Sequence, residues 1–153
     1  MKEVSIHGYR EDLKQYFRSK MEANYARFLE YMRDKGKIKK WEYESKEFEF
    51  KKIKRGNRYY KPDFKVTDIN DEYNWAELKG YFRLSDKTKL RRFKKFYPEE
   101  FLNLFIVIPD KYSRSKSNGE MIGFIIAELG IRFEDIVSFK DIENCRSFIP
   151  DWE

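Results

Sequence analysis

The sequence predicts one domain of the α/β class, an α+β arrangement with a mixed sheet and elements in the order helix, three strands, helix, strand, plus a small helical C-terminal cap. Two observations support this class. Apolar residues repeat at helical spacing in separate segments and alternate at strand spacing between them. The length of 153 residues suits a single domain. We expect that domain to cover residues 1–153, with an N-terminal arm or helix (1–18), a core (19–109) and a cap (110–153).

The N-terminal segment is rich in helix-forming residues, which predicts helices over residues 9–17 and 19–35. In the second helix, apolar side chains recur at helical spacing at Met21, Tyr25, Phe28, Leu29 and Met32. Ser19 is a suitable N-cap and Gly36 a suitable stop. At about 100° per residue, Glu22 falls on the shoulder of the apolar stripe, so its carboxylate should face the edge of the core.

Strand-like alternation begins after Lys39. The expected strands contain Trp41 and Tyr43, then Phe48 and Phe50, then residues 59–67, and last residues 75–79. Residues 51–61 read as a basic connection, with a turn signal at Gly56-Asn57. The later elements are a helix over 86–96 ended by Pro98, a buried strand over 102–108, a polar loop over 113–119 and a helix over 120–129 closed by Gly130.

The composition excludes several chemistries. Cys145 is the only cysteine, so it has no intramolecular disulfide partner, and with the only histidine, His7, it is too little for a structural zinc site. Histidine-centred nucleases and Ser-His-Asp hydrolases need a histidine among other catalytic groups, whereas His7 lies in a polar stretch and is expected to be solvated. No apolar run approaches the roughly 20 residues of a membrane span, and a signal-peptide core is missing. We therefore expect a cytoplasmic protein without a membrane partner.

The charge balance indicates a phosphate-binding surface. The chain has 33 Lys and Arg against 27 Asp and Glu, a net charge of +6, and 18% aromatic residues. The segment from residue 130 onward is acidic overall, so a nucleic-acid surface should lie upstream of it. Two basic clusters are candidates for contact with a DNA backbone: Lys51, Lys52, Lys54, Arg55 and Arg58, and Lys87, Lys89, Arg91, Arg92, Lys94 and Lys95.

Three residues with useful chemistry lie on two of the expected strands. Asp63 follows Lys61-Pro62, and Glu77 and Lys79 are two apart in a strand, so the latter two side chains leave the same face. If the two strands are neighbours, all three groups meet at one point. The carboxylates of Asp63 and Glu77 would then hold Mg²⁺ or Mn²⁺, which activates a water for attack on a phosphate. Lys79 would position that water or stabilise the charge growing on the phosphate.

The motif Lys61-Pro62-Asp63 followed by Glu77-Leu78-Lys79 resembles the signature of the PD-(D/E)XK nuclease superfamily. The resemblance implies a core in the order α-β-β-β-α-β, which agrees with the order derived above. Carried over, the superfamily aspartate is Asp63, its second acid is Glu77 and its lysine is Lys79. A first-helix acid found in many members would be Glu22, which would join the catalytic and metal-binding groups.

Within that superfamily the chain is most similar to the phage endonuclease I family of Holliday-junction-resolving enzymes, over about residues 22–152. The matching segments outside the motif include Trp41-Glu42-Tyr43-Glu44, residues 129–133 and Ile149-Pro150-Asp151-Trp152. The resemblance implies a Mg²⁺-dependent endonuclease acting on branched or duplex DNA in recombination and repair. It also implies a homodimer in which the connection 45–57 passes between subunits, so that Glu22 completes the partner's site. This chain has a longer turn between the two motif strands and lacks a basic C-terminal tail.

Two alternatives remain open. One keeps the active site but changes the substrate, as in sequence-directed or mismatch-directed nicking enzymes and transposase-associated nucleases of the same fold. A requirement for a sequence rather than a branch would identify it. The other is a non-catalytic nucleic-acid-binding module in which the carboxylates only pair with nearby lysines. The matching placement of four groups argues against that module.

Overall fold

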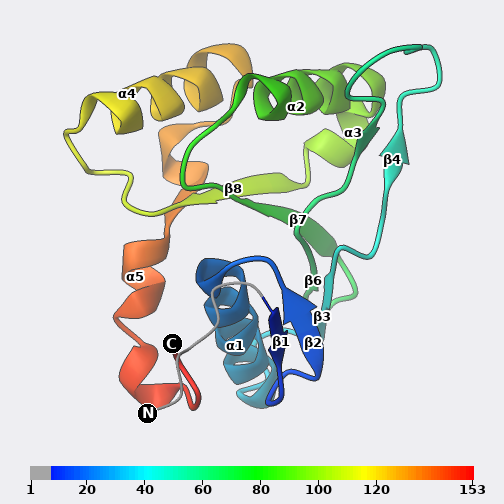
Figure 1. The fold of residues 1–153 in the computed structure, drawn as a ribbon. Helices are drawn as coiled ribbons and strands as arrows, with labels where there is room; N and C mark the ends of the chain where they lie inside the picture. The colour runs from blue at the N-terminus through cyan, green and yellow to red at the C-terminus, as the bar shows by residue number, and fades with distance from the viewer. Residues whose placement is uncertain (1–7) are drawn as a thin grey trace.

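The computed structural model describes residues 8–153 and contains a mixed five-stranded sheet with helices on both faces (Figure 1). In sheet order, the strands are β3 (Lys40–Tyr43), β6 (Phe64–Thr67), β7 (Tyr73–Leu78), β8 (Leu104–Ile108) and β9 (Ile136–Ser138). The first three form an antiparallel meander, and β7, β8 and β9 run parallel. The mixed α/β class is confirmed. The expectation for His7 lies outside the described residues.

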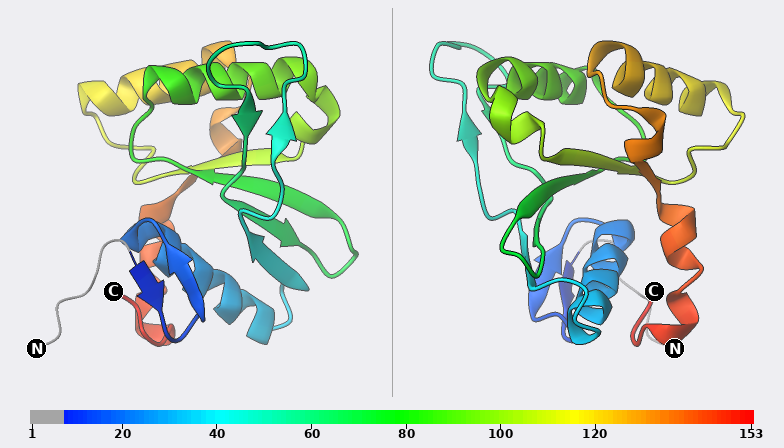
Figure 2. Two further views of the ribbon diagram at one scale, coloured as in Figure 1. Left: turned by 45° about the vertical axis from the view of Figure 1, so that its right-hand side comes forward. Right: turned by 180° about the vertical axis from the view of Figure 1, so that it is seen from behind.

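Helices cover both faces of the sheet (Figures 1 and 2). One face carries α2 (Leu84–Phe96), α3 (Pro98–Phe101), α4 (Lys116–Gly123) and its π-helical continuation η1 (Phe124–Glu128), and the other carries α1 (Lys20–Asp34) and α5 (Phe139–Glu143). Side chains alternate along each strand, so each face of the sheet has its own hydrophobic core. Ile106 and Ile108 pack into the core beneath α2 and α4, and Val107 packs into the core beneath α1 and α5. Because both faces of β8 are buried, its sequence is a continuous apolar run.

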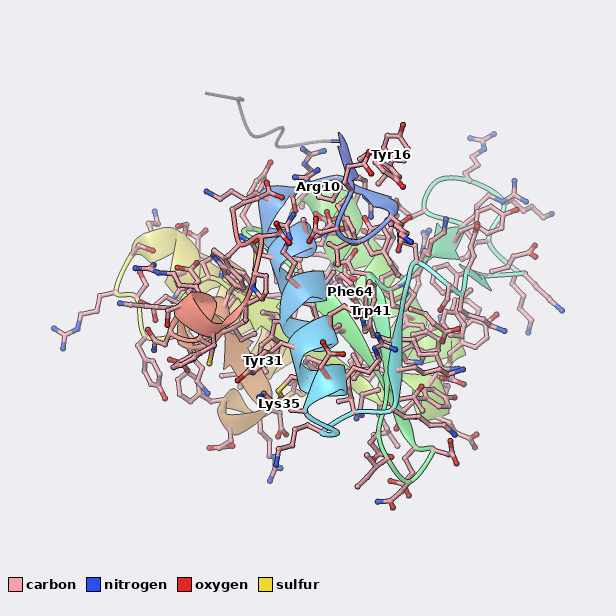
Figure 3. All side chains as sticks on the ribbon, turned by 90° about the horizontal axis from the view of Figure 1, so that it is seen from below. Arg10, Tyr16, Tyr31, Lys35, Trp41 and Phe64 are labelled. Carbon is pink, nitrogen blue, oxygen red and sulfur yellow. The ribbon has the colours of Figure 1, made fainter. Side chains whose placement is uncertain are left out.

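Helix α1 begins and ends as the sequence predicts. The Ser19 hydroxyl oxygen accepts the backbone N–H of Glu22 at 3.0 Å. The helix ends before Gly36, whose φ of 71° is a left-handed conformation that stops a helix. Its buried Tyr25 makes an edge contact with Phe64 of β6, and Figure 3 shows Phe64 and Trp41 beside this helix. This contact packs α1 against the meander.

The predicted helix over residues 9–17 is wrong. These residues form an antiparallel hairpin of β1 (Gly8–Arg10) and β2 (Gln15–Phe17). Lys14, with a φ of 53°, lies in its turn. Phe17 is buried in the core beneath α1, and Arg10 is buried in an ion pair with Glu153. These tertiary contacts outweigh the helix propensity of the segment.

A two-stranded arm, defined as residues 48–60, interrupts the meander. Its strands β4 (Phe48–Glu49) and β5 (Tyr59–Tyr60) pair with each other and not with the main sheet. The base of the arm is anchored by Phe48, whose ring lies 4.9 Å from that of Phe93 on α2. Near its tip, Arg92 of α2 donates to the carbonyl oxygen of Asn57 at 2.9 Å. The arm therefore stands along α2 (Figure 2).

The C-terminal region is more than the expected helical cap. β9 extends the sheet as its fifth strand, and α5 covers the same face as α1. Two short turns flank them, η2 (Phe133–Asp135) and η3 (Arg146–Phe148). The loop predicted over 113–119 is shorter, because α4 already begins at Lys116. The helical stretch does end before Gly130, which has a φ of 72°.

Within residues 8–153, every helix is too short or too polar to cross a membrane.

Candidate active site

A polar cleft of about 540 Å³ lies where β6 begins and β7 ends, next to the first turns of α2. Its acidic lining residues are Glu44, Asp63, Glu77 and Asp86. Its basic lining residues are Arg18, Lys61, Lys79, Arg83 and Lys89. Three of the four predicted catalytic residues, Asp63, Glu77 and Lys79, thus face one cleft.

The antiparallel register of β6 and β7 brings the two acids of the motif together. Phe64 pairs with Ala76, and one step further along this register Asp63 lies opposite Glu77. Asp63 Oδ2 accepts the backbone N–H of Leu78 at 2.8 Å, which fixes the carboxylate at the strand end. Leu78 points to the opposite core, so the alternation predicted for Glu77, Leu78 and Lys79 is present.

Glu77 and Lys79 are held by partners that the motif does not include. The Tyr60 hydroxyl donates to Glu77 Oε2 at 2.9 Å, and Lys79 Nζ lies 3.6 Å from Glu77 Oε1. Lys79 Nζ also donates to Asp86 Oδ1 at 3.1 Å. Asp86 is in the first turn of α2, where its other oxygen accepts the backbone N–H of Arg83 at 2.9 Å. The start of α2 therefore sets the position of the lysine.

Glu22, the fourth predicted residue, reaches the site from the first turn of α1. Its carboxylate accepts hydrogen bonds from the Tyr43 hydroxyl at 2.7 Å and from the Ser19 hydroxyl at 3.0 Å. The residue is buried at 8% exposure, which agrees with the core-edge position derived from the helical angle. Carboxylate oxygens of Glu22, Glu44 and Asp63 lie within 4.8 Å of one another. We call these three residues the carboxylate trio.

Arg18, between β2 and α1, is the cation beside the trio. Its Nη2 lies 3.5 Å from Asp63 Oδ1 and 3.9 Å from Glu22 Oε2, and it forms an ion pair with Glu44. Burial lowers the pKa of Arg18, but a hydrogen bond to Tyr43 and the charges of Glu44 and Glu22 raise it more. Arg18 thus stays positively charged among these acids.

Burial dominates the electrostatics of the two motif acids. It raises the pKa of Asp63 well above its ordinary value, and the charges of Glu77 and Glu22 raise it further. Burial likewise raises the pKa of Glu77 from 4.5 to about 7, against the opposing effects of Lys79 and the Tyr60 hydroxyl. The pKa of Lys79 is lowered by burial but raised more by the charges of Glu77 and Asp86. The site therefore favours additional positive charge near its carboxylates.

The donors suit a hard divalent cation. Carboxylate oxygens are the ligands that Mg²⁺ and Mn²⁺ prefer. The raised pKa of buried Asp63 shows that the nearby lysine and arginine do not offset burial and repulsion at this carboxylate. Of the predicted metal ligands, Asp63 and Glu77 are buried and line this cleft, and Glu22 is buried beside Asp63. Glu77 is not part of the carboxylate trio. Glu44 is a further carboxylate beside Asp63 and Glu22 that the sequence analysis did not select.

The predicted DNA-binding residues divide into two groups. The exposed ones at the arm tip are Lys51, Lys52, Lys54, Arg55 and Arg58. On α2, Lys89 lines the cleft and Lys95 is exposed. The others on α2 make contacts within the chain: Lys87 stacks over Phe124, Arg91 pairs with Glu128, Arg92 holds the arm and Lys94 bonds the carbonyl of Leu129. The arm tip therefore offers the denser group of exposed cations.

Five residues of the site were not predicted from the sequence, namely Arg18, Glu44, Tyr60, Arg83 and Asp86. Glu44 belongs to the segment Trp41-Glu42-Tyr43-Glu44, for which the sequence predicted no chemical role. Tyr60 falls within the stretch predicted as a strand, and its position two residues before Pro62 was the available signal. Arg18 lies between the two predicted helices, at a position for which the sequence predicted no role.

Comparison with known proteins found no family model, no curated protein and no solved structure that matches this chain. The function of the site must therefore be inferred from its residues and their geometry.

Proposed function

We propose that this protein is a metal-dependent DNA endonuclease, and more specifically a structure-selective Holliday-junction resolvase that hydrolyses phosphodiester bonds in branched DNA in the cytoplasm. The observation that carries the proposal is the meeting of Asp63, Glu77 and Lys79 in one polar cleft, with Glu22 beside Asp63. Carboxylates that are buried close together are uncommon in purely structural roles, because burial and mutual repulsion both oppose their charge. Such an arrangement is expected where a metal and a phosphate bind.

The order of the sheet supports a PD-(D/E)XK type of core. An antiparallel meander of β3, β6 and β7 is followed by a helix and then by β8, parallel to β7. In this topology the two motif acids come from adjacent inner strands of the sheet, where β6 begins and β7 ends. The expected order α-β-β-β-α-β corresponds to α1, β3, β6, β7, α2 and β8 when the arm is treated as an insertion.

The roles of the residues follow from their contacts. Asp63, Glu77 and Glu22 would hold Mg²⁺, with Mn²⁺ as a substitute, and a bound cation would supply Lewis-acid stabilisation and an activated water. Tyr60 keeps the Glu77 carboxylate turned toward the cleft through its hydrogen bond. Lys79, steadied by Asp86, would stabilise negative charge on the phosphate under attack. The cleft's Lys61, Arg83 and Lys89 would neutralise neighbouring phosphates.

We further propose that the active form is a homodimer. Resolution of a junction needs two cuts on opposed strands, and a two-fold dimer supplies two sites by symmetry. In the isolated chain the arm folds back on itself, and Glu22 lies beside Asp63 of the same chain. In a dimer with exchanged segments, the same contacts would form between chains.

Cleavage of a four-way junction and of a matched linear duplex, each with Mg²⁺ and with EDTA, tests the proposed function. We expect Mg²⁺-dependent cutting near the branch and little cutting of the duplex. Asp63→Asn should slow cutting by about 100-fold or more, because it removes a charged metal ligand. Asp141→Asn removes an equal charge from an exposed position on α5 and should cut normally.

Three outcomes would contradict parts of this proposal. DNA cleavage in EDTA at the full rate would rule out a requirement for a divalent metal. Equal cutting of both substrates would favour a sequence-directed or mismatch-directed nuclease with the same site. Binding of DNA without any cutting would favour the non-catalytic module.

A further inference from the structure

Arg18 occupies the position where the carboxylate trio needs a cation. Its guanidinium is within ion-pair distance of all three acids, at 3.5 Å from Asp63 and 3.9 Å from Glu22 for the two longer contacts. The carboxylate oxygens lie within 4.8 Å of one another, so without a cation they would repel strongly. The arginine is therefore the cation that offsets part of the negative charge of the trio.

The Arg18 side chain enters the site from solvent. It is 60% exposed, whereas the side chains of Glu22 and Asp63 are 10% and 8% exposed. Its backbone is fixed between β2 and the N-cap Ser19, but the long side chain above it can withdraw without moving an element. Because a guanidinium keeps its proton at all relevant pH values, it leaves such a site as a cation and does not become neutral there.

We propose that Arg18 is the resident cation of the metal-free site and competes with the divalent metal for Asp63 and Glu22, the two members of the carboxylate trio that are also proposed metal ligands. This inference rests on the metal dependence put forward above. Metal entry then requires withdrawal of the guanidinium, and Arg18 sets the metal concentration at which the site fills. The withdrawn side chain remains at the cleft wall, where DNA phosphate is the expected anionic partner.

Metal titration by calorimetry, without DNA, tests the competition directly. Arg18→Gln should bind Mn²⁺ and Ca²⁺ more tightly than the wild type. If Arg18 fills the site about nine-tenths of the time in metal-free protein, its removal raises the apparent affinity about tenfold. In EDTA, the same variant should melt at a lower temperature than the wild type, and added Mn²⁺ should raise its melting temperature by more.

Arg83→Gln is the matched control. Arg83 lines the same cleft and carries the same charge, but its side chain contacts Tyr81 and not the trio. Any general gain in metal affinity from the loss of a positive charge will appear in this variant as well. An Arg18→Gln affinity no higher than that of Arg83→Gln overturns the proposal.

A spectroscopic measurement keeps the test independent of folding differences. The ¹⁵N side-chain resonance of Arg18, assigned by its absence in Arg18→Gln, should shift during a Ca²⁺ titration of wild-type protein. The Arg83 resonance should shift much less. An unchanged Arg18 resonance at saturating Ca²⁺ also overturns the proposal.

The competition and the proposed function can fail separately. If Arg18→Gln binds metal more tightly but neither it nor the wild type cuts DNA, the competition stands and the nuclease assignment fails. If the wild type cuts junctions with Mg²⁺ but Arg18→Gln shows no gain in affinity, the nuclease assignment stands and Arg18 has another role.

Discussion

Glu77 is a buried carboxylate, at 4% exposure, in the middle of a sheet that would be more stable with a neutral side chain there. Its pKa is raised to about 7 by burial. A group whose pKa is higher in the folded than in the unfolded chain contributes stability that is complete at low pH and is lost as the pH rises through the folded value. The metal-free protein should thus lose part of its stability between about pH 4.5 and about pH 7.

The first prediction is that Glu77→Gln is more stable than the wild type in EDTA at neutral to alkaline pH. The introduced amide keeps an acceptor for the Tyr60 hydroxyl but carries no charge to bury. The difference in free energy of unfolding should be near zero at about pH 4 and reach about 3 kcal/mol at about pH 8. Urea unfolding across this pH range provides the measurement. A constant difference at all pH values would show that the buried charge is not responsible.

The second prediction concerns Asp86, which positions Lys79 without belonging to the motif. Asp86→Asn should lower kcat for junction cleavage about tenfold with little change in KM, because the ammonium loses its anchor. Loss of this negative neighbour should also lower the pKa of Lys79, so the alkaline limb of the pH–rate profile should move to lower pH.

Glu99→Gln, an exposed acid on α3, is the control for Asp86→Asn and should leave the profile unchanged. Asp86→Asn with an unaltered pH–rate profile but a lower melting temperature would mean that Asp86 only stabilises the start of α2.

At the level of residues, the sequence was sufficient to predict the site groups that lie on two neighbouring strands. Asp63, Glu77 and Lys79 could be predicted because strand alternation and a single antiparallel register decide where they lie. Arg18 and Asp86 could not, since their positions depend on how β2 and α2 pack against the meander. Spacing along the chain carries no information on that packing.

Among the elements, the N-terminal hairpin shows the limit of local propensity. The residues from Glu11 to Tyr16 are compatible with a helix, and no glycine or proline separates β1 from β2. The hairpin is stabilised by burial of the last residue of each strand. Arg10 ends β1 and forms a buried ion pair, and Phe17 ends β2 and packs into the core. β9 was missed for a related reason, since three residues are too few to reveal a period.

The third prediction belongs to the arm. Replacing Lys54 and Arg55 by Gln should weaken DNA binding in Ca²⁺ and reduce the slope of log K against log salt by about 1 to 2, because each phosphate contact contributes roughly 0.9 to that slope. Both residues are exposed at the arm tip. Fluorescence anisotropy at several salt concentrations measures the slope.

Arg33→Gln combined with Arg132→Gln is the control for the arm, because it removes the same charge from arginines that pair with Glu30 and Asp135. This variant should keep the wild-type slope. If the slope of log K against log salt falls equally in the two double variants, the net charge of the protein, and not the arm, is responsible.

For the whole molecule, the fourth prediction concerns the dimer with exchanged segments. Glu22→Ala and Asp63→Ala proteins should each be inactive, and refolding them together should restore nicking. In an exchanged heterodimer one composite site holds both defects and the other holds neither. If each chain builds its own site, as the isolated chain does, every site keeps one defect and no activity returns. Gel filtration of the refolded mixture reports the dimer.

The packing of α1 over the meander has a kinetic consequence. β3 pairs with β6 over four positions, and Tyr25 of α1 lies against Phe64 of β6. Passing α1 and β3 to another chain would break this ladder and expose both rings, which costs roughly 1.5–3 kcal/mol for each large apolar side chain. The barrier to exchange thus approaches that of unfolding, which is slow for many small domains under native conditions. Chain concentration during folding, not during storage, would then decide whether a preparation is monomeric or exchanged, and native proteins mixed for hours should keep their original partners.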